Sequence, residues 1–326
     1  MLFPWFLFLL IPHMMNSTPN RLAYAAKLRN YRKIQNYRTI VVDQSGHGHF
    51  YSIQKAVDSI PSYNNNWVII DIKAGIYWEK VYIPAEKPYI ILRGEGRKKT
   101  KIAWGDHSTT SQSPTFESSA NNTIAKGITF WNTYNFPLGA NRNPWVPAVA
   151  VKISGDQSAF HRCTFLGVQD TLWDDKGRHY FNHCTIVGSV DYIFGGGQSI
   201  YESCNLVTLD GGFITAQARD GPDDPSGFVF IGCNVTGVGP VYLGRAWRQY
   251  SRVLFYRSSF SNIIDPRGWN SWDFSGHEYD ITYAEYGNYG PGADTSNRVY
   301  WEKKLSSQEV GQLASLSFIN ADQWLH

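Results

Sequence analysis

Charged residues are scarce in this 326-residue chain. Asp, Glu, Lys and Arg make up 17% of it, whereas roughly a quarter is typical of soluble domains. The 30 basic and 27 acidic residues leave a formal net charge of only +3, and no dense basic run indicates binding to nucleic acid. Aromatic residues reach 15%, enough for a large core. This balance favours an extracellular β-protein over a cytosolic helical enzyme.

Long apolar runs are missing after the first residues, so the sequence predicts no membrane span. The opening stretch MLFPWFLFLLIPHMM has the length of a signal peptide, although the basic residues that normally precede such a core are absent. We therefore predict secretion, with a buried N-terminal segment as the alternative. Three glycosylation triplets agree with secretion; they begin at Asn16, Asn121 and Asn234.

The chain divides into three predicted parts: a signal or processed segment (1–24), a polar extension (25–37) and one domain (38–326) without an internal linker. Helical spacing of apolar residues predicts one helix at Ser52–Ser59 and a second at Ser306–Ser315. Short alternating segments elsewhere predict strands, of which the clearest are Thr39–Asp43, Trp67–Ile72 and Tyr89–Leu92.

A repeat runs through the middle of the chain. The segments AFHRCTFLG, YFNHCTIVG, IYESCNLVT, VFIGCNVTG and LFYRSSFSN share an apolar pair, then a Cys or Ser, then a polar and an apolar residue. Their Cys or Ser positions are 163, 184, 204, 233 and 258, which are 21, 20, 29 and 25 residues apart. This period is that of one coil of a parallel β-helix, with loops inserted into the longer coils. The predicted fold is all-β: a parallel β-helix with an N-terminal capping helix and a C-terminal helical tail.

The four cysteines, Cys163, Cys184, Cys204 and Cys233, all occupy one position of this repeat. Four cysteines in a secreted chain ordinarily indicate two disulfides. Stacked along a β-helix they would instead form a column with about 4.8 Å between neighbours. We favour buried thiols, and a disulfide between neighbours stays open. No histidine accompanies them at metal-ligand spacing, so we predict no zinc site.

Two aspartates are separated by one coil of this repeat. Asp170 lies in FLGVQDTLWDD and Asp191 in GSVDYIFGGG, 21 residues later. Residues one coil apart should lie side by side, and two close carboxylates tend to differ in protonation, as an acid and a base or nucleophile must. The alternative is two solvated aspartates on a loop face. Asp174 and Asp175, which precede the turn Lys-Gly-Arg, are interpreted as solvated or as lining a groove.

A cation and an aromatic residue follow two coils later in YLGRAWRQ. The guanidinium of Arg245 can contact Asp191 in bidentate fashion and keep it ionised. Trp247, two residues further along the same extended segment, should face the same side. An exposed tryptophan beside charges suits a sugar ring, although a core tryptophan is the alternative.

At this point the sequence resembles a known family. The blocks GVQDTL (167–172), VDYIFG (190–195) and LGRAW (243–247) are similar to the three hallmark blocks of plant pectin methylesterases, or pectinesterases. AGIYWEKVYIP, AEYGNYGPGADTSNRV and SFINADQWL resemble further blocks, so the resemblance covers about 38–326. It implies a right-handed parallel β-helix, in agreement with the repeat. We expect a form without the inhibitor-like pro-region that many members carry.

The resemblance implies hydrolysis of galacturonate methyl esters in pectin, which releases methanol. By this resemblance Asp191 is the nucleophile, Asp170 the general acid and then base, Gln169 an oxyanion donor, and Arg245 the partner of Asp191. The implied substrate contacts are Trp247, Thr115, Phe194 and Trp173. Neither metal nor cofactor is implied. The expected partners are methyl-esterified pectin and a proteinaceous pectinesterase inhibitor, and we expect a secreted, cell-wall monomer.

One position departs from the family. Where members usually carry a second oxyanion glutamine in Gln-Ala-Val-Ala, this chain reads Pro147-Ala-Val-Ala. Because loss of one oxyanion donor costs on the order of a hundred- to thousandfold in rate, we expect activity that survives but is weaker than in members with glutamine. The alternatives are an inactive pectin-binding homologue, a calcium-dependent pectate lyase and a polygalacturonase.

Overall fold

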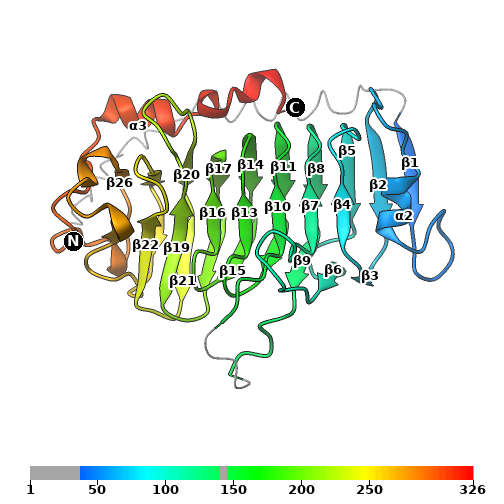
Figure 1. Ribbon diagram of the computed structural model, residues 1–326, viewed down its shortest axis with the longest axis horizontal. Coiled ribbons are helices and arrows are strands. Elements are labelled where there is room, and N and C mark those ends of the chain that lie inside the picture. Colours follow the sequence, from blue (N-terminus) through cyan, green and yellow to red (C-terminus); the bar gives the residue numbers. More distant parts are fainter. Residues whose placement is uncertain (1–36, 140–144, 326) are drawn as a thin grey trace, which may run out of the picture. The chain divides into compact units, whose positions relative to one another are not determined.

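The structure is a computed structural model that describes residues 37–139 and 145–325. The predicted signal segment and almost all of the predicted extension lie outside the described residues. The described chain winds into a right-handed parallel β-helix made of three parallel sheets (Figure 1). This is the predicted fold. None of the helices among the described residues is long and apolar enough to cross a membrane.

Apart from the two end coils, which contribute only to sheet A, each coil contributes one strand to each sheet, so the strands of a sheet are neighbours in space but not in sequence. Sheet A contains β1 (Arg38–Val42), β2 (Val68–Ile72), β5 (Ile90–Gly94), β8 (Thr123–Lys126), β11 (Ser158–His161), β14 (Arg178–Asn182), β17 (Gln198–Glu202), β20 (Gly227–Ile231), β23 (Arg252–Tyr256) and β26 (Thr282–Tyr286). Sheet B contains β3 (Gly75–Trp78), β6 (Thr100–Trp104), β9 (Thr129–Asn132), β12 (Thr164–Leu166), β15 (Thr185–Gly188), β18 (Asn205–Thr208), β21 (Asn234–Gly237) and β24 (Ser259–Phe260). Sheet C contains β4 (Val81–Ile83), β7 (Phe116–Ser118), β10 (Val151–Ile153), β13 (Leu172–Asp174), β16 (Ile193–Gly195), β19 (Gly212–Gln217), β22 (Val241–Ala246) and β25 (Trp269–Asn270).

Both predicted helices are present. Helix α2 (Ile53–Asp58) packs against β1, β2 and β4, and the hydroxyl of its N-cap Ser52 accepts from an amide of the first turn. Helix α3 (Ser307–Leu313) begins with a capping box between Ser306 and Glu309. The remaining helical segments are 3₁₀ turns: η2 (Trp272–Phe274), η3 (Glu278–Asp280), η4 (Pro291–Ala293), η5 (Leu316–Ile319) and η6 (Ala321–Gln323). The C-terminal helical tail lies along one edge of the β-helix, where η5 contacts β17 (Figure 1).

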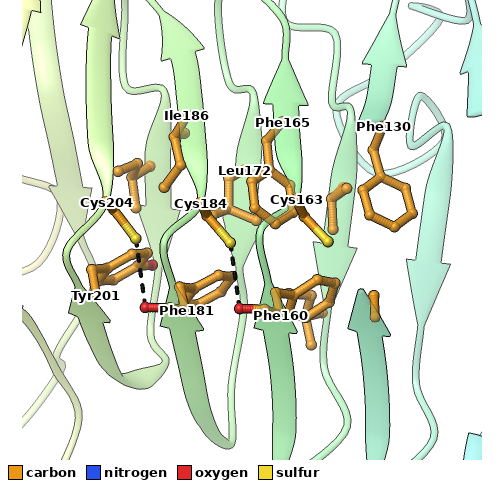
Figure 2. Close-up of a cluster of buried hydrophobic side chains, with 14 of the residues drawn as sticks. Phe130, Phe160, Cys163, Phe165, Leu172, Phe181, Cys184, Ile186, Tyr201 and Cys204 are labelled. Carbon is orange, nitrogen blue, oxygen red and sulfur yellow. Dashed lines mark hydrogen bonds between the residues drawn. The ribbon is translucent and has the colours of Figure 1, made fainter. Parts of the chain in front are cut away.

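A ladder of aromatic rings fills the interior beside sheet A. Phe160, Phe181, Tyr201, Phe230 and Phe255 occupy equivalent positions of successive strands. Neighbouring rings are stacked with centroids 5.3, 4.5, 4.6 and 4.4 Å apart. Figure 2 shows three of these rings in one row, each belonging to a different coil. Since an aromatic pair contributes about 0.5–1.5 kcal/mol beyond its buried area, this ladder helps to fix the register of the coils that carry the site.

The cysteine column lies next to this ladder, and all four cysteines are free and buried. The Cys184 thiol donates to the carbonyl of Phe160 at 3.3 Å, and the Cys204 thiol donates to that of Phe181 at 3.5 Å (Figure 2). Both of these thiols thus reach back to the preceding coil, where each satisfies a backbone oxygen. The prediction of buried thiols in one repeat position is confirmed.

Candidate active site

A cavity of about 400 Å³ opens on the outer face of sheet C. Four strands supply its floor in strict register: Trp173 of β13 pairs with Phe194 of β16, which pairs with Ala216 of β19, which pairs with Arg245 of β22. The complete lining is Thr110, Gln169, Asp170, Trp173, Asp191, Phe194, Ala216, Arg245, Trp247 and Trp272. Parallel pairing therefore gathers residues from four coils into one site.

The two predicted carboxylates lie at equivalent turns of neighbouring coils. Gln169 and Val190, the residues that precede them, form a parallel bridge, and the Asp170 amide donates to the Val190 carbonyl at 3.0 Å. Both aspartates adopt left-handed backbone angles, with φ of 61° at Asp170 and 48° at Asp191. Aspartate tolerates this conformation better than most residues, and such angles are concentrated at functional sites. The predicted one-coil separation of the two aspartates is confirmed.

Arg245 contacts Asp191 in a bidentate ion pair. Its Nε lies 2.8 Å from Oδ1 and its Nη2 lies 2.5 Å from Oδ2 of the carboxylate. The guanidinium is held between two rings, 3.5 Å from the centre of Trp272 and 4.4 Å from that of Phe213. This stacking fixes the guanidinium plane, so the ion pair has one geometry.

Burial dominates the electrostatics of the carboxylates. It raises the pKa of Asp170 to about 8, with a further increase from the neighbouring Asp191 and a partial decrease from Arg245. Burial also raises the pKa of Asp191, but the hydrogen bonds and charge of Arg245 oppose that rise. Because only Asp191 is bonded to the guanidinium, Asp191 ionises first and Asp170 keeps its proton near neutral pH.

Aromatic side chains form one wall of the cavity. Trp173 stacks on Phe194 with ring centroids 5.3 Å apart, and Trp247 follows at 5.9 Å from Phe194. On the other side of Trp173, the ammonium of Lys152 lies 4.6 Å from the ring centre and 3.2 Å from a carboxylate oxygen of Glu117. The wall therefore offers apolar faces next to charged groups, a combination that suits an amphipathic ligand such as an oligosaccharide.

Of the eight residues predicted for the site, seven line this cavity; they are Gln169, Asp170, Trp173, Asp191, Phe194, Arg245 and Trp247. Thr115 does not. It is fully buried just before β7, and its hydroxyl donates to the Trp131 carbonyl at 3.2 Å, so it is not available to a ligand here. Thr110, five residues earlier in the same loop, lines the cavity instead.

Thr110, Ala216 and Trp272 were missed by the sequence reasoning. Thr110 and Trp272 lie outside the repeating strands, where the period of the coil gives no information on direction. Ala216 lies one coil after Phe194, so the repeat could have identified it, but alanine carries no chemical signal.

The interpretation of Asp174 as a solvated or groove-lining residue is wrong. Asp174 is fully buried at the end of β13 and points away from the cavity that Trp173 lines. Its carboxylate accepts from the Tyr201 hydroxyl at 2.5 Å and lies 2.5 Å from Nδ1 of His179. Alternation along a strand explains this, since the residue after an outward Trp173 must point inward. Asp174 thus supports the fold. Among the described residues there is no group of three or more His, Cys, Asp or Glu side chains placed to hold a metal ion.

Comparisons with known proteins agree with this geometry. A family profile described as Pectinesterase matches residues 39–322. Probable pectinesterase 55 of Arabidopsis thaliana is 53% identical over 88% of this chain and 89% of its own length, and probable pectinesterase 29 of the same plant is 52% identical over 88% of each chain. Among solved structures, pectin methylesterase from carrot is 35% identical, with a TM-score of 0.82 over 88% of this chain and 94% of that chain.

Proposed function

Because the chain belongs to the pectinesterase family, we propose that it hydrolyses the methyl esters of galacturonate in pectin through Asp191 and Asp170. The observation that carries the proposal is the asymmetry of the carboxylate pair. One aspartate is bonded to Arg245 and ionised, and its neighbour is buried with a pKa of about 8. A nucleophile and a general acid therefore lie in the same cavity.

The proposed reaction has two steps. A carboxylate oxygen of Asp191 attacks the ester carbonyl, and the tetrahedral intermediate collapses as Asp170 gives its proton to the departing methoxide, which leaves as methanol. Water then attacks the resulting acyl-enzyme and Asp170, now ionised, takes a proton from it. The C–O bond to Asp191 breaks, which releases the galacturonate carboxylic acid and restores both aspartates.

Gln169 is the proposed oxyanion donor. Its side-chain amide lines the cavity and makes no hydrogen bond to another described residue, so it is available to the developing negative charge. Gln169 directly precedes Asp170 in the chain and lines the same cavity. Arg245 keeps Asp191 ionised, and Trp173, Phe194 and Trp247 are the proposed contacts for the sugar rings.

Product analysis tests this function. Wild-type protein should release methanol from methylated pectin in proportion to the acid that forms. A polygalacturonase would generate new reducing ends, and a pectate lyase would generate unsaturated uronates and require calcium. Methanol without either of these products supports the proposal. A folded wild-type protein that binds pectin but releases no methanol would establish the inactive homologue instead.

The pH profile reports the protonation of Asp170. A general acid works only while it is protonated, so kcat/KM should fall as the pH rises through about 8, whereas the loss of activity at low pH reports protonation of Asp191. The measurement is initial-rate methanol release at a series of pH values, corrected for alkaline hydrolysis in the absence of enzyme. Undiminished activity well above pH 9 would rule out Asp170 as the acid.

Pro147 stands where family members usually carry a second oxyanion glutamine, so substitutions at this position test the contribution of that donor. It lies directly before Ala148, whose amide donates to the Gln169 carbonyl at 3.2 Å, so a longer side chain at 147 begins beside the proposed oxyanion donor. Pro147→Gln should raise kcat by up to about a hundredfold, since an added oxyanion donor acts in the transition state. Pro147→Leu is the matched control without a donor. Equal rates for the two variants would contradict the proposal.

We also propose a secreted, cell-wall location, a monomer, and regulation by a proteinaceous pectinesterase inhibitor. Asn121 and Asn234, which begin two of the glycosylation triplets, are both exposed, which supports passage through the secretory pathway. Immunolocalisation in plant tissue together with the mass of the glycosylated and deglycosylated protein would test the location.

A further inference from the structure

We call the cavity that contains Asp170 and Asp191 the catalytic cavity. A second cavity lies outside it, at the ends of β3 and β6 in sheet B. Its volume is about 510 Å³ and it is lined by Trp78, Trp104, Gly105, Asp106 and His107; we call it the aromatic cavity. Trp78 is 58% exposed and Trp104 is 39% exposed. Two exposed tryptophans that share a cavity are an unusual surface for a soluble protein and indicate a binding site.

The sheet holds these rings as a platform. Trp78 of β3 pairs with Ala103 of β6, and Ala103 pairs with Trp131 of β9. The small side chain of Ala103 lets the rings of Trp78 and Trp131 approach across it to 6.3 Å between centroids. Trp104 is the last residue of β6, where it pairs with Asn132 of β9 just before the loop. The indole positions are therefore fixed by strands, and little ordering is needed when a flat ligand binds.

The charges beside the platform favour an anionic ligand. Lys101 lies two residues before Ala103 on β6, hence on the same outer face, and it makes no ion pair with another described residue. The acidic member of the cavity, Asp106, is already paired with Lys80 at 2.8 Å. His107 is stacked on Tyr134 with ring centroids 3.4 Å apart, which holds the loop against the sheet.

One loop, residues 105–114, joins this cavity to the catalytic cavity. Asp106 and His107 line the aromatic cavity, whereas Thr110 lines the catalytic one. Between them a third cavity, of about 480 Å³, includes Lys80, Tyr82, Asp106 and Glu117. Glu117 shares an outward register with Lys152 and Trp173, the wall of the catalytic cavity. A chain of cavities thus leads from the catalytic carboxylates to the tryptophans.

We propose that the aromatic cavity is a remote binding site for acidic polysaccharide, which holds another stretch of the same galacturonan chain whose esters are hydrolysed at Asp191. This inference rests on the proposed function. Tryptophan faces take the apolar faces of pyranose rings, and Lys101 takes a uronate carboxylate. The site acts on long substrates only, because a short oligosaccharide in the catalytic cavity does not reach it.

The test uses the double variant Trp78→Ala/Trp104→Ala, with Tyr300→Ala, which removes a 91% exposed ring elsewhere, as the matched control. On long methylated pectin the double variant should show a KM about three- to tenfold higher at unchanged kcat, the loss expected for one or two aromatic contacts. On a methylated trigalacturonate both constants should equal those of wild type. Lys101→Gln should weaken binding to polygalacturonate and reduce its dependence on salt.

Binding measured without turnover separates this inference from the proposed function. Wild-type protein and the double variant are compared by affinity electrophoresis in gels that contain polygalacturonate. Retardation of wild type and of Tyr300→Ala but not of the double variant supports the site, even if no methanol is ever released. Equal retardation of all three proteins overturns it. A wild-type dimer that the double variant converts to a monomer, seen by light scattering, would also overturn it, because the tryptophans would then serve self-association.

Discussion

Asp191→Asn is expected to lower kcat for methanol release by about four orders of magnitude or more, the scale found when a catalytic nucleophile is removed. Asparagine has nearly the same shape and accepts the left-handed backbone of this position, so the fold should survive. What is lost is the negative oxygen that attacks the ester. The measurement is methanol release by variant and wild type at equal concentration, with thermal unfolding as a check of folding.

Asp175→Asn is the matched control for that experiment. Asp175 lies five residues after Asp170, and its carboxylate accepts from the Ser154 hydroxyl at 2.8 Å rather than lining the catalytic cavity. It should keep activity within about a few-fold of wild type, as expected for a residue that contacts no substrate. Residual activity of Asp191→Asn above one hundredth of wild type would reject Asp191 as the nucleophile, unless the asparagine has deamidated, which mass spectrometry detects.

Arg245→Leu is expected to lower kcat/KM at least about tenfold near neutral pH, because the buried Asp191 loses the charge that keeps it ionised, and each unit by which its pKa exceeds the pH lowers the ionised fraction about tenfold. Two bonds to Asp191 disappear, and its pKa, which burial already raises, rises further. Less nucleophile is then ionised at a given pH. The acid limb of the pH–rate profile should therefore move to higher pH, which initial rates across the pH range would reveal.

The shift of the profile distinguishes this role from a loss of substrate binding. Arg245→Lys should recover part of the rate, since it restores the charge without the bidentate geometry. Arg267→Leu is the control, because its side chain is 66% exposed and pairs with Asp265 away from the cavity. An unmoved profile with only KM increased would mean that Arg245 binds substrate and does not set the ionisation of Asp191.

The fold could be predicted from the sequence because one sequence repeat corresponds to one coil of the β-helix. The cysteine position recurs once per coil, and the structure places Cys163, Cys184, Cys204 and Cys233 in one column. The same period brings Asp170 beside Asp191. The contact between Arg245 and Asp191 was predictable for the same reason. Because the parallel strands are in register, the position of a residue in the repeat indicates which face of the β-helix its side chain occupies.

The site predictions that were wrong or incomplete concern residues whose side-chain direction cannot be obtained from the repeat. Asp174 was assigned to the turn before Lys176, whereas it is the last residue of the three-residue strand β13 and therefore points inward after the outward Trp173. The family resemblance implied that Thr115 contacts substrate. The direction of its side chain depends, however, on the bend that leads into β7. Thr110 and Trp272 stand in irregular segments, where side-chain direction is set by tertiary contacts that no local pattern encodes.

The burial of Asp170 has a consequence for folding as well as for catalysis. Its pKa is about 8 in the folded protein, against 3.8 for an unperturbed side chain. The folded state therefore holds this proton more tightly than the unfolded chain, and the resulting stabilisation is fully present below about pH 4 and is lost as the pH rises through about 8. Asp170→Asn should remove this loss, so that the difference in unfolding free energy between variant and wild type grows from pH 5 to pH 8. Asp170 is therefore both the proposed acid in methanol release and a group whose protonation stabilises the fold, so that a more acidic medium favours the native state.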